Sequence, residues 1–288
     1  MKFIEIDLDG TVVRASLNEE GAPKTTQAVW DALPFGGKAV HAQISGEMFR
    51  MLDHAPVGEL EVEARVSHQY PGMMVFLPQI EEIAFCVEQA RFSGGVIPST
   101  LTHLGDIEAD FSAFMRKGDA LDRTGAKPIQ FRRAADQTTP FRHRTYEGRR
   151  LDVTFDGVTV GATLLEKMSP KTTSAFAKLL PLEGDATNDT WGGQITRFWG
   201  AGPGGALPVS VGETEAPRHL IWPGFAYFDP VRRHLKIAYG ESDFKDVSGP
   251  IPVTPVFAID GADLPKYAAK AKLQLTEGAK RLSIKLRG

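Results

Sequence analysis

A histidine and a glutamate stand six residues apart, shortly before an arginine, and these three side chains could act together on a polar molecule. His41 and Glu47 can gain or lose a proton near neutral pH when their surroundings place their pKa values suitably. Arg50 could hold an anionic group of the same molecule. The sequence therefore offers the hypothesis of a small-molecule enzyme, with His41 and Glu47 as the catalytic pair and Arg50 as a binding residue.

The stretch that contains these residues occurs twice. Residues 9–50 and 156–197 align at a constant offset of 147 without a gap, and 17 of the 42 aligned positions are identical. Unrelated sequences of ordinary composition agree at roughly one position in fifteen. Residues 71–78 match 223–230 at an offset of 152, which places a five-residue insertion in the Gly- and Pro-rich segment just before the second of these. The chain is therefore a tandem duplication.

The two copies differ at the positions that could do chemistry. Asn188 and Gln194 replace His41 and Glu47, whereas the arginine is kept as Arg197. Both changes exchange a titratable side chain for a neutral one that still forms hydrogen bonds. The first copy could act on a ligand and the second could bind one without acid–base chemistry. Drift of surface positions after the duplication would give the same differences.

Further candidate ligand residues are aromatic and charged side chains near the ends of predicted strands. Such side chains suit a small polar ligand at the mouth of a barrel, although half-buried strand aromatics give the same pattern. The complete predicted ligand-binding set is Arg50, Tyr70, Glu88, Arg91, Phe92, Asn188, Gln194, Arg197, Tyr239 and Glu241.

The elements that must position these side chains are mostly short strands. Residues 2–17 alternate apolar and polar around Asp9-Gly10, which predicts a β-hairpin. Pro23 opens a predicted helix that ends before Pro34. Several short segments bounded by Gly, Pro or Asp follow, and they predict a barrel or a sandwich.

Three later segments complete the predicted first domain. Residues 59–66 alternate like a strand, residues 90–105 form a long connection, and residues 127–133 form the closing strand. The polar, basic stretch 134–149 has no apolar periodicity and is predicted to be a linker. The expected domains are therefore 1–133 and 150–288.

Bulk composition excludes several classes of protein. Apolar residues make up 42% of the chain and the net charge is −3, values typical of a globular protein with no overall attraction to nucleic acid or anionic membranes. The first residues lack the apolar run of a signal peptide, and we expect a soluble, cytoplasmic protein. Cys86 is the single cysteine, and no close histidine pair suggests a metal. We expect no cofactor and a small-molecule partner, and a homo-oligomer remains open.

The duplicated motifs resemble those of the cyclophilin-like superfamily, in particular its uncharacterised bacterial members. The resemblance covers nearly all of both halves outside the linker. It is carried in both copies by Pro-Lys-Thr, as Pro23-Lys24-Thr25 and Pro170-Lys171-Thr172. In the first copy it is also carried by Leu33-Pro34, Gly37 with His41, Gly46-Glu47, Pro71-Gly72, and Gly125-Ala126 with Ile129 and Phe131.

This resemblance implies a mainly β protein of two closed eight-stranded barrels, each capped by about two short helices. True cyclophilins use a Phe-His-Arg segment and a downstream Gln-Gly-Gly-Asp, and the segments around Arg50 and Arg197 lack both. Peptidyl-prolyl isomerase activity is therefore disfavoured. Binding of a small polar or anionic metabolite at a pocket on a barrel surface is the expected function, and a non-catalytic binding or scaffold module is the alternative.

Overall fold

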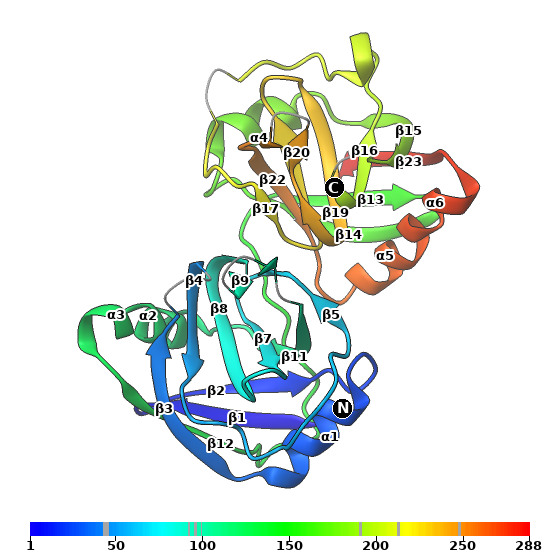
Figure 1. Cartoon of the computed structure of the whole chain (residues 1–288). Helices are drawn as coiled ribbons and strands as arrows, with labels where there is room; N and C mark the ends of the chain where they lie inside the picture. Colours follow the sequence, from blue (N-terminus) through cyan, green and yellow to red (C-terminus); the bar gives the residue numbers. More distant parts are fainter. Residues whose placement is uncertain are drawn as a thin grey trace. The chain divides into compact units, whose positions relative to one another are not determined.

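The computed structural model divides into two compact units, Met1–Arg142 and His143–Gly288 (Figure 1). Each unit is described by itself. The structure describes residues 1–42, 46–91, 93–94, 97–98, 100–189, 192–211, 214–246 and 249–288.

The first unit is a closed ring of antiparallel strands in the order β2-β1-β12-β3-β4-β8-β7-β11, in which β11 pairs back with β2 (Figure 1). Closure leaves the ring without a free edge. The ring strands are β1 (Phe3–Leu8), β2 (Thr11–Leu17), β3 (Phe35–His41), β4 (Gly46–Met51), β7 (Met73–Leu77), β8 (Glu82–Arg91), β11 (Leu101–Ile107) and β12 (Lys127–Arg133). The remaining elements are β5 (Arg65–Val66), β6 (His68–Gln69), β9 (Ser93–Gly94), β10 (Ile97–Pro98), α1 (Pro23–Ala32), α2 (Ser112–Asp119) and α3 (Leu121–Thr124).

The second unit repeats this ring in the order β16-β15-β23-β13-β14-β22-β18-β19, and β19 pairs back with β16. Its ring strands are β13 (Arg150–Phe155), β14 (Val158–Leu164), β15 (Leu182–Asn188), β16 (Gly193–Phe198), β18 (Phe225–Asp229), β19 (His234–Asp243), β22 (Thr254–Ile259) and β23 (Lys280–Leu286). The remaining elements are α4 (Pro170–Ala177), η1 (Pro203–Gly205), β17 (Leu220–Ile221), β20 (Lys245–Asp246), β21 (Gly249–Pro250), α5 (Leu264–Lys272) and α6 (Gln274–Glu277). The predicted pair of closed, mainly β barrels is confirmed.

The repeated Pro-Lys-Thr-Thr motif binds a carboxylate from a distant segment. In the first unit, Glu63 accepts hydrogen bonds from the backbone N–H of Lys24 at 3.3 Å and from both the N–H and the hydroxyl of Thr25 at 2.8 Å. These N–H groups open α1 and have no partner inside the helix, so the carboxylate caps its positive end. The strand predicted over 59–66 is wrong for all but Arg65–Val66, because Glu63 is used as this cap.

The second unit contains the same cap. Glu215 accepts hydrogen bonds from the N–H of Lys171 at 3.1 Å and from the N–H and hydroxyl of Thr172, both at 2.7 Å. The motif therefore serves the same structural purpose in each copy, and its retention carries no information about a ligand.

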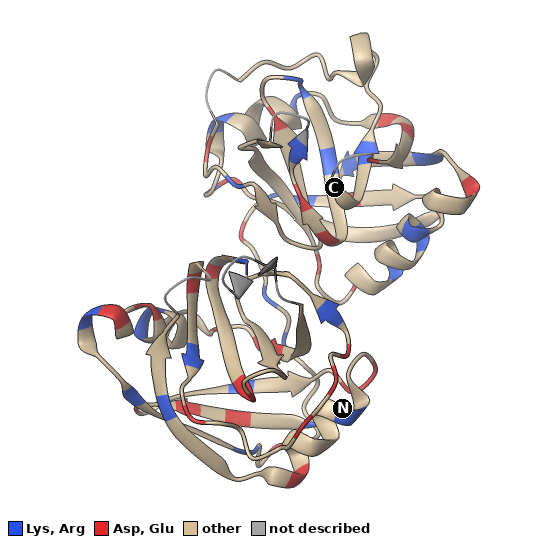
Figure 2. Ribbon diagram, in the orientation of Figure 1, with Lys and Arg blue, Asp and Glu red and all other residues tan. Residues whose placement is uncertain are grey.

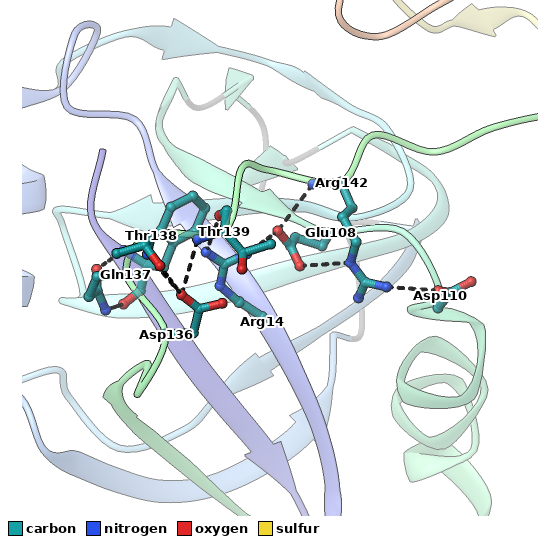
Figure 3. Close-up of polar contacts among 9 residues, drawn as sticks. Arg14, Glu108, Asp110, Asp136, Gln137, Thr138, Thr139 and Arg142 are labelled. Carbon is teal, nitrogen blue, oxygen red and sulfur yellow. Dashed lines mark hydrogen bonds and ion pairs between the residues drawn. The ribbon is translucent and has the colours of Figure 1, made fainter.

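Two segments differ from their predicted form. The connection predicted over 90–105 contains the start of β11, which begins at Leu101. Residues 134–142 of the predicted linker are bound to the first barrel (Figure 3). Gln137 exchanges hydrogen bonds with the backbone of Phe3, at 2.9 and 2.7 Å, and Arg142 donates to the buried carboxylate of Glu108 at 3.1 and 3.3 Å.

Positively and negatively charged residues are interspersed along the ribbon of each unit (Figure 2). Within the described ranges, no helix combines the length and the apolar character that a membrane crossing requires.

Candidate functional site

The predicted catalytic pair lies at one end of the first barrel. His41 is the last residue of β3 and is half-buried, opposite Phe49 of β4. Since paired residues share one face of a sheet and Phe49 belongs to the core, His41 lies on the inner face. Glu47 is exposed on β4, where the pairing with β8 shifts register. Residues 43–45 between them lie outside the described residues.

The neighbourhood of Glu47 includes the single cysteine. Burial raises the pKa of the Cys86 thiol, and the charges of Glu88 and Glu47 raise it further. The thiol is therefore protonated at neutral pH and is a poor nucleophile.

Arg50 is already neutralised in the first unit. Its guanidinium forms an ion pair with Glu82, the first residue of β8, and Glu82 is buried. Holding an anionic ligand at Arg50 would therefore require breaking this pair.

Tyr70 belongs to a polar cluster that sequence reasoning missed. Its hydroxyl donates to Asp106 Oδ1 at 2.7 Å, and Asp106 Oδ2 lies 3.1 Å from His103 Nε2. Burial and then the charge of Asp106 raise the pKa of the Tyr70 phenol. Burial alone would lower the pKa of His103, but the charge and hydrogen bond of Asp106 outweigh it and raise that pKa. In this cluster the Asp106 carboxylate bridges the Tyr70 phenol and the His103 imidazole.

This cluster exists in the first unit alone. At the offset of 152, the positions of Tyr70, His103 and Asp106 are occupied in the second copy by Trp222, Pro255 and Ala258. A comparison of the copies at these positions was the one signal in the sequence that could have found the cluster.

The other predicted residues of the first unit lie towards the end of β8. Cys86 Sγ lies 3.5 Å from the backbone oxygen of Glu88, and Arg91 pairs with His68 of β6. Phe92 lies outside the described residues.

Four predicted residues of the second unit meet at the ends of three strands. The Tyr239 hydroxyl donates to Asn188 Oδ1 at 2.6 Å, and the backbone N–H of Glu241 donates to Gln194 Oε1 at 3.0 Å. Asn188 is the last residue of β15, Gln194 is the second residue of β16, and the other two residues belong to β19. The structure therefore brings these residues together at one end of the second barrel.

The fifth predicted residue, Arg197, lies on the outer face of the same barrel. Its Nη2 donates to His234 Nε2 at 3.0 Å and to the backbone oxygen of Gly204. The guanidinium carbon lies 4.2 Å from the ring centre of Trp199. His234 occupies the position that Glu82 holds in the first unit, at an offset of 152. The carboxylate partner of the arginine has thus been exchanged for an imidazole.

The carboxylates near Arg197 and His234 pair with other cations, and Asp229 forms an ion pair with Arg232 at 3.3 Å. The neighbour of Arg197 across the sheet, Lys236, forms a buried ion pair of 2.9 Å with Asp189. Burial lowers the pKa of Arg197, and the charge of Asp189 only partly offsets this effect. Burial and then the charges of Arg197 and Lys236 lower the pKa of His234, and the charge of Asp229 only partly offsets this effect. A lowered pKa favours the neutral imidazole, which can accept the hydrogen bond from Arg197. Among the described residues, no carboxylate forms an ion pair with Arg197.

Comparisons with known proteins give the following. Residues 4–133 match a protein family described as "Protein of unknown function (DUF3830)". No protein of curated function matches the chain. Two solved structures are similar over about half of it. "Structure of McbB in complex with tryptophan" has 21% identity and a TM-score of 0.40, covering 48% of this chain and 47% of that one. "Solution structure of the hypothetical protein AF2241 from Archaeoglobus fulgidus" has 18% identity and a TM-score of 0.35, covering 46% and 95%.

Proposed function

We propose that the second unit binds a small anionic molecule through Arg197 on the surface of its barrel. The observation that carries this proposal is the exchange of Glu82 for His234. In the first copy Arg50 forms an ion pair with Glu82. In the second copy the arginine is retained as Arg197, but a histidine stands in place of the carboxylate. A carboxylate or phosphate group of a ligand would supply the missing negative charge.

Arg197 has N–H groups on Nε and Nη1 that a ligand anion could use. Nη2 is used by His234 and Gly204, but the buried Nε has no hydrogen-bond partner among the described residues. Guanidinium groups form charge-assisted hydrogen bonds with carboxylate and phosphate oxygens. Trp199 is 39% exposed and offers an apolar surface beside the charge. The proposed ligand is therefore a small carboxylate or phosphate ester.

The test exchanges the partner residues of the two arginines. His234→Glu rebuilds in the second unit the ion pair that the first unit contains. We expect phosphate or acetate to raise the melting temperature of the wild-type chain, since a ligand at about 100 times its Kd stabilises by about 2.7 kcal/mol. We expect His234→Glu to lose this response. Chloride at the same ionic strength controls for general salt effects.

The matched control is Glu82→His, which frees Arg50 in the first unit and should add an anion response there. The proposal is wrong if no anion stabilises the wild-type chain more than chloride does, or if His234→Glu responds as strongly as the wild type.

A further inference from the structure

The interiors of the two barrels differ at equivalent positions. The last strands of the two barrels, β12 and β23, align at an offset of 153. The same offset aligns the helices before them, α2 and α3 with α5 and α6. Two apolar residues of the first interior correspond at this offset to polar residues of the second, and a third pair is related by the offset of 147 that holds for residues 9–50. Phe49, Phe114 and Leu121 correspond to Thr196, Tyr267 and Gln274.

The first interior is closed by aromatic packing. Phe49 stacks on Phe85 with ring centres 4.8 Å apart, and Phe114 lies 5.5 and 5.6 Å from these two rings. The first barrel folds with apolar residues at the positions of Phe49, Phe114 and Leu121. The fold therefore does not require the polar residues that occupy these positions in the second barrel.

The second interior contains polar atoms without partners. Gln274 Nε2 donates to Thr196 Oγ1 and to the backbone oxygen of Ala271, both at 2.8 Å. Gln274 Oε1 forms no hydrogen bond with any residue that the structure describes. The Tyr267 hydroxyl interacts with the Thr196 side chain but has no partner among the described residues at normal hydrogen-bond geometry. Their residues are only 5% and 1% exposed. Buried polar atoms without partners cost free energy, and each one requires an explanation.

Further polar side chains extend from Thr196 to the end of the second barrel. Asn188 pairs with Thr196 across β15 and β16, so both side chains lie on the inner face. The Tyr239 hydroxyl donates to Asn188, and Tyr239 belongs to the core cluster that also contains Tyr267. The second barrel thus holds an interior polar row from Asn188 to Gln274, and its member residues are Asn188, Tyr239, Tyr267, Thr196 and Gln274.

We infer that the interior polar row is a second binding site, for a small neutral molecule that carries both a hydrogen-bond donor and an acceptor, such as a primary amide or an alcohol. The ligand donates to Gln274 Oε1 and exchanges a hydrogen bond with the Tyr267 hydroxyl. A neutral ligand is required because the row contains no charged side chain, and an ion buried without a partner is strongly disfavoured. Thr196 and Arg197 are adjacent on β16 and face opposite sides, so this site is independent of the proposed anion site.

The experiment uses acetamide as the probe and the full-length chain. We expect acetamide to shift the side-chain amide signal of Gln274 in a ¹⁵N-correlated NMR spectrum, saturably, and to raise the melting temperature of the chain. Acetone, which accepts but does not donate, should do neither. Tyr267→Phe and Gln274→Leu should each abolish the thermal response to acetamide.

The control variant is Tyr227→Phe, which removes a buried hydroxyl that already accepts a hydrogen bond from the backbone of Trp222 at 3.1 Å. It should lower stability but keep the response to acetamide. The inference is overturned if the Gln274 signal of the wild-type chain does not move, or if acetamide stabilises Tyr267→Phe as much as the wild type. The NMR result on the wild type decides the question even if a variant fails to fold.

Discussion

Replacing Glu63 by alanine should destabilise the first unit by removing the cap of α1. Three donors lose their acceptor, two of Thr25 at 2.8 Å and one of Lys24 at 3.3 Å. Loss of a helix cap costs about 0.5–2 kcal/mol, and loss of a negative charge at a helix N-terminus costs about 0.3–1 kcal/mol more. The expected total is about 1–3 kcal/mol. For a unit of this size, the melting temperature should fall by about 4–10 °C.

The effect should depend on pH in a defined direction. Burial alone would raise the pKa of Glu63, but hydrogen bonds from Thr25 and Lys24 outweigh it and lower that pKa below 4.5. A carboxyl group with a lowered pKa in the folded state stabilises above its unfolded pKa, and this stabilisation is lost as the pH falls through the folded value. The wild type and Glu63→Ala should therefore differ at pH 7 and converge towards pH 3.

Calorimetry of the full chain measures the loss of stability caused by Glu63→Ala at each pH. Glu215→Ala is the equivalent change in the second unit. Glu215 accepts the same three hydrogen bonds, so the two variants should lose similar amounts of stability. Glu59→Ala removes an exposed carboxylate from the segment that contains Glu63 and should change stability by less than about 0.5 kcal/mol. A loss at Glu63→Ala that is absent at pH 7, or undiminished at pH 3, would refute the capping argument.

Two further changes test buried charges in the first unit. Glu108→Ala leaves Arg14, only 14% exposed, without its ion-pair partner and should cost about 3–5 kcal/mol in urea unfolding, and a cost below about 1 kcal/mol would contradict this assignment. His103→Gln should destabilise most at low pH. Because Asp106 raises the pKa of His103 in the folded state, its stabilisation is full below the unfolded pKa of about 6.5 and is lost as the pH rises through the folded value. A difference between wild type and His103→Gln that grows with rising pH would show the opposite sign.

The first hairpin and the duplication could be predicted because their signals are local or repeated, whereas the strand pattern alone left a barrel or a sandwich open and closure was implied by the family resemblance. Asp9-Gly10 marks a hairpin within a few residues, and the same order of elements at a fixed offset requires the same fold twice. The cap could not be predicted, since Glu63 lies 38 residues from Thr25 in a segment whose alternation is typical of a strand. Local pattern cannot show that a side chain reaches a distant helix.

The candidate sites were predictable where the copies could be compared directly. Arg197 was identified by its retention in both copies, but the decisive exchange of Glu82 for His234 lies beyond the insertion, where the offset changes. The roles of His41 and Glu47 in acid–base chemistry stay a prediction, as does the cyclophilin-like relationship.

The position of the closing strand has a consequence for synthesis of the chain. β12 lies between β1 and β3, so the first ring cannot close until Arg133 has been made. A further 16 residues, 134–149, precede β13, the first strand of the second copy. At about 5–20 residues per second, translation of this segment takes about 1–3 s. During this time β12 can pair with β1 and β3 and complete the first barrel. The similar hairpin of the second copy, β13 and β14, is made only afterwards, so it cannot pair with the same strand edges first.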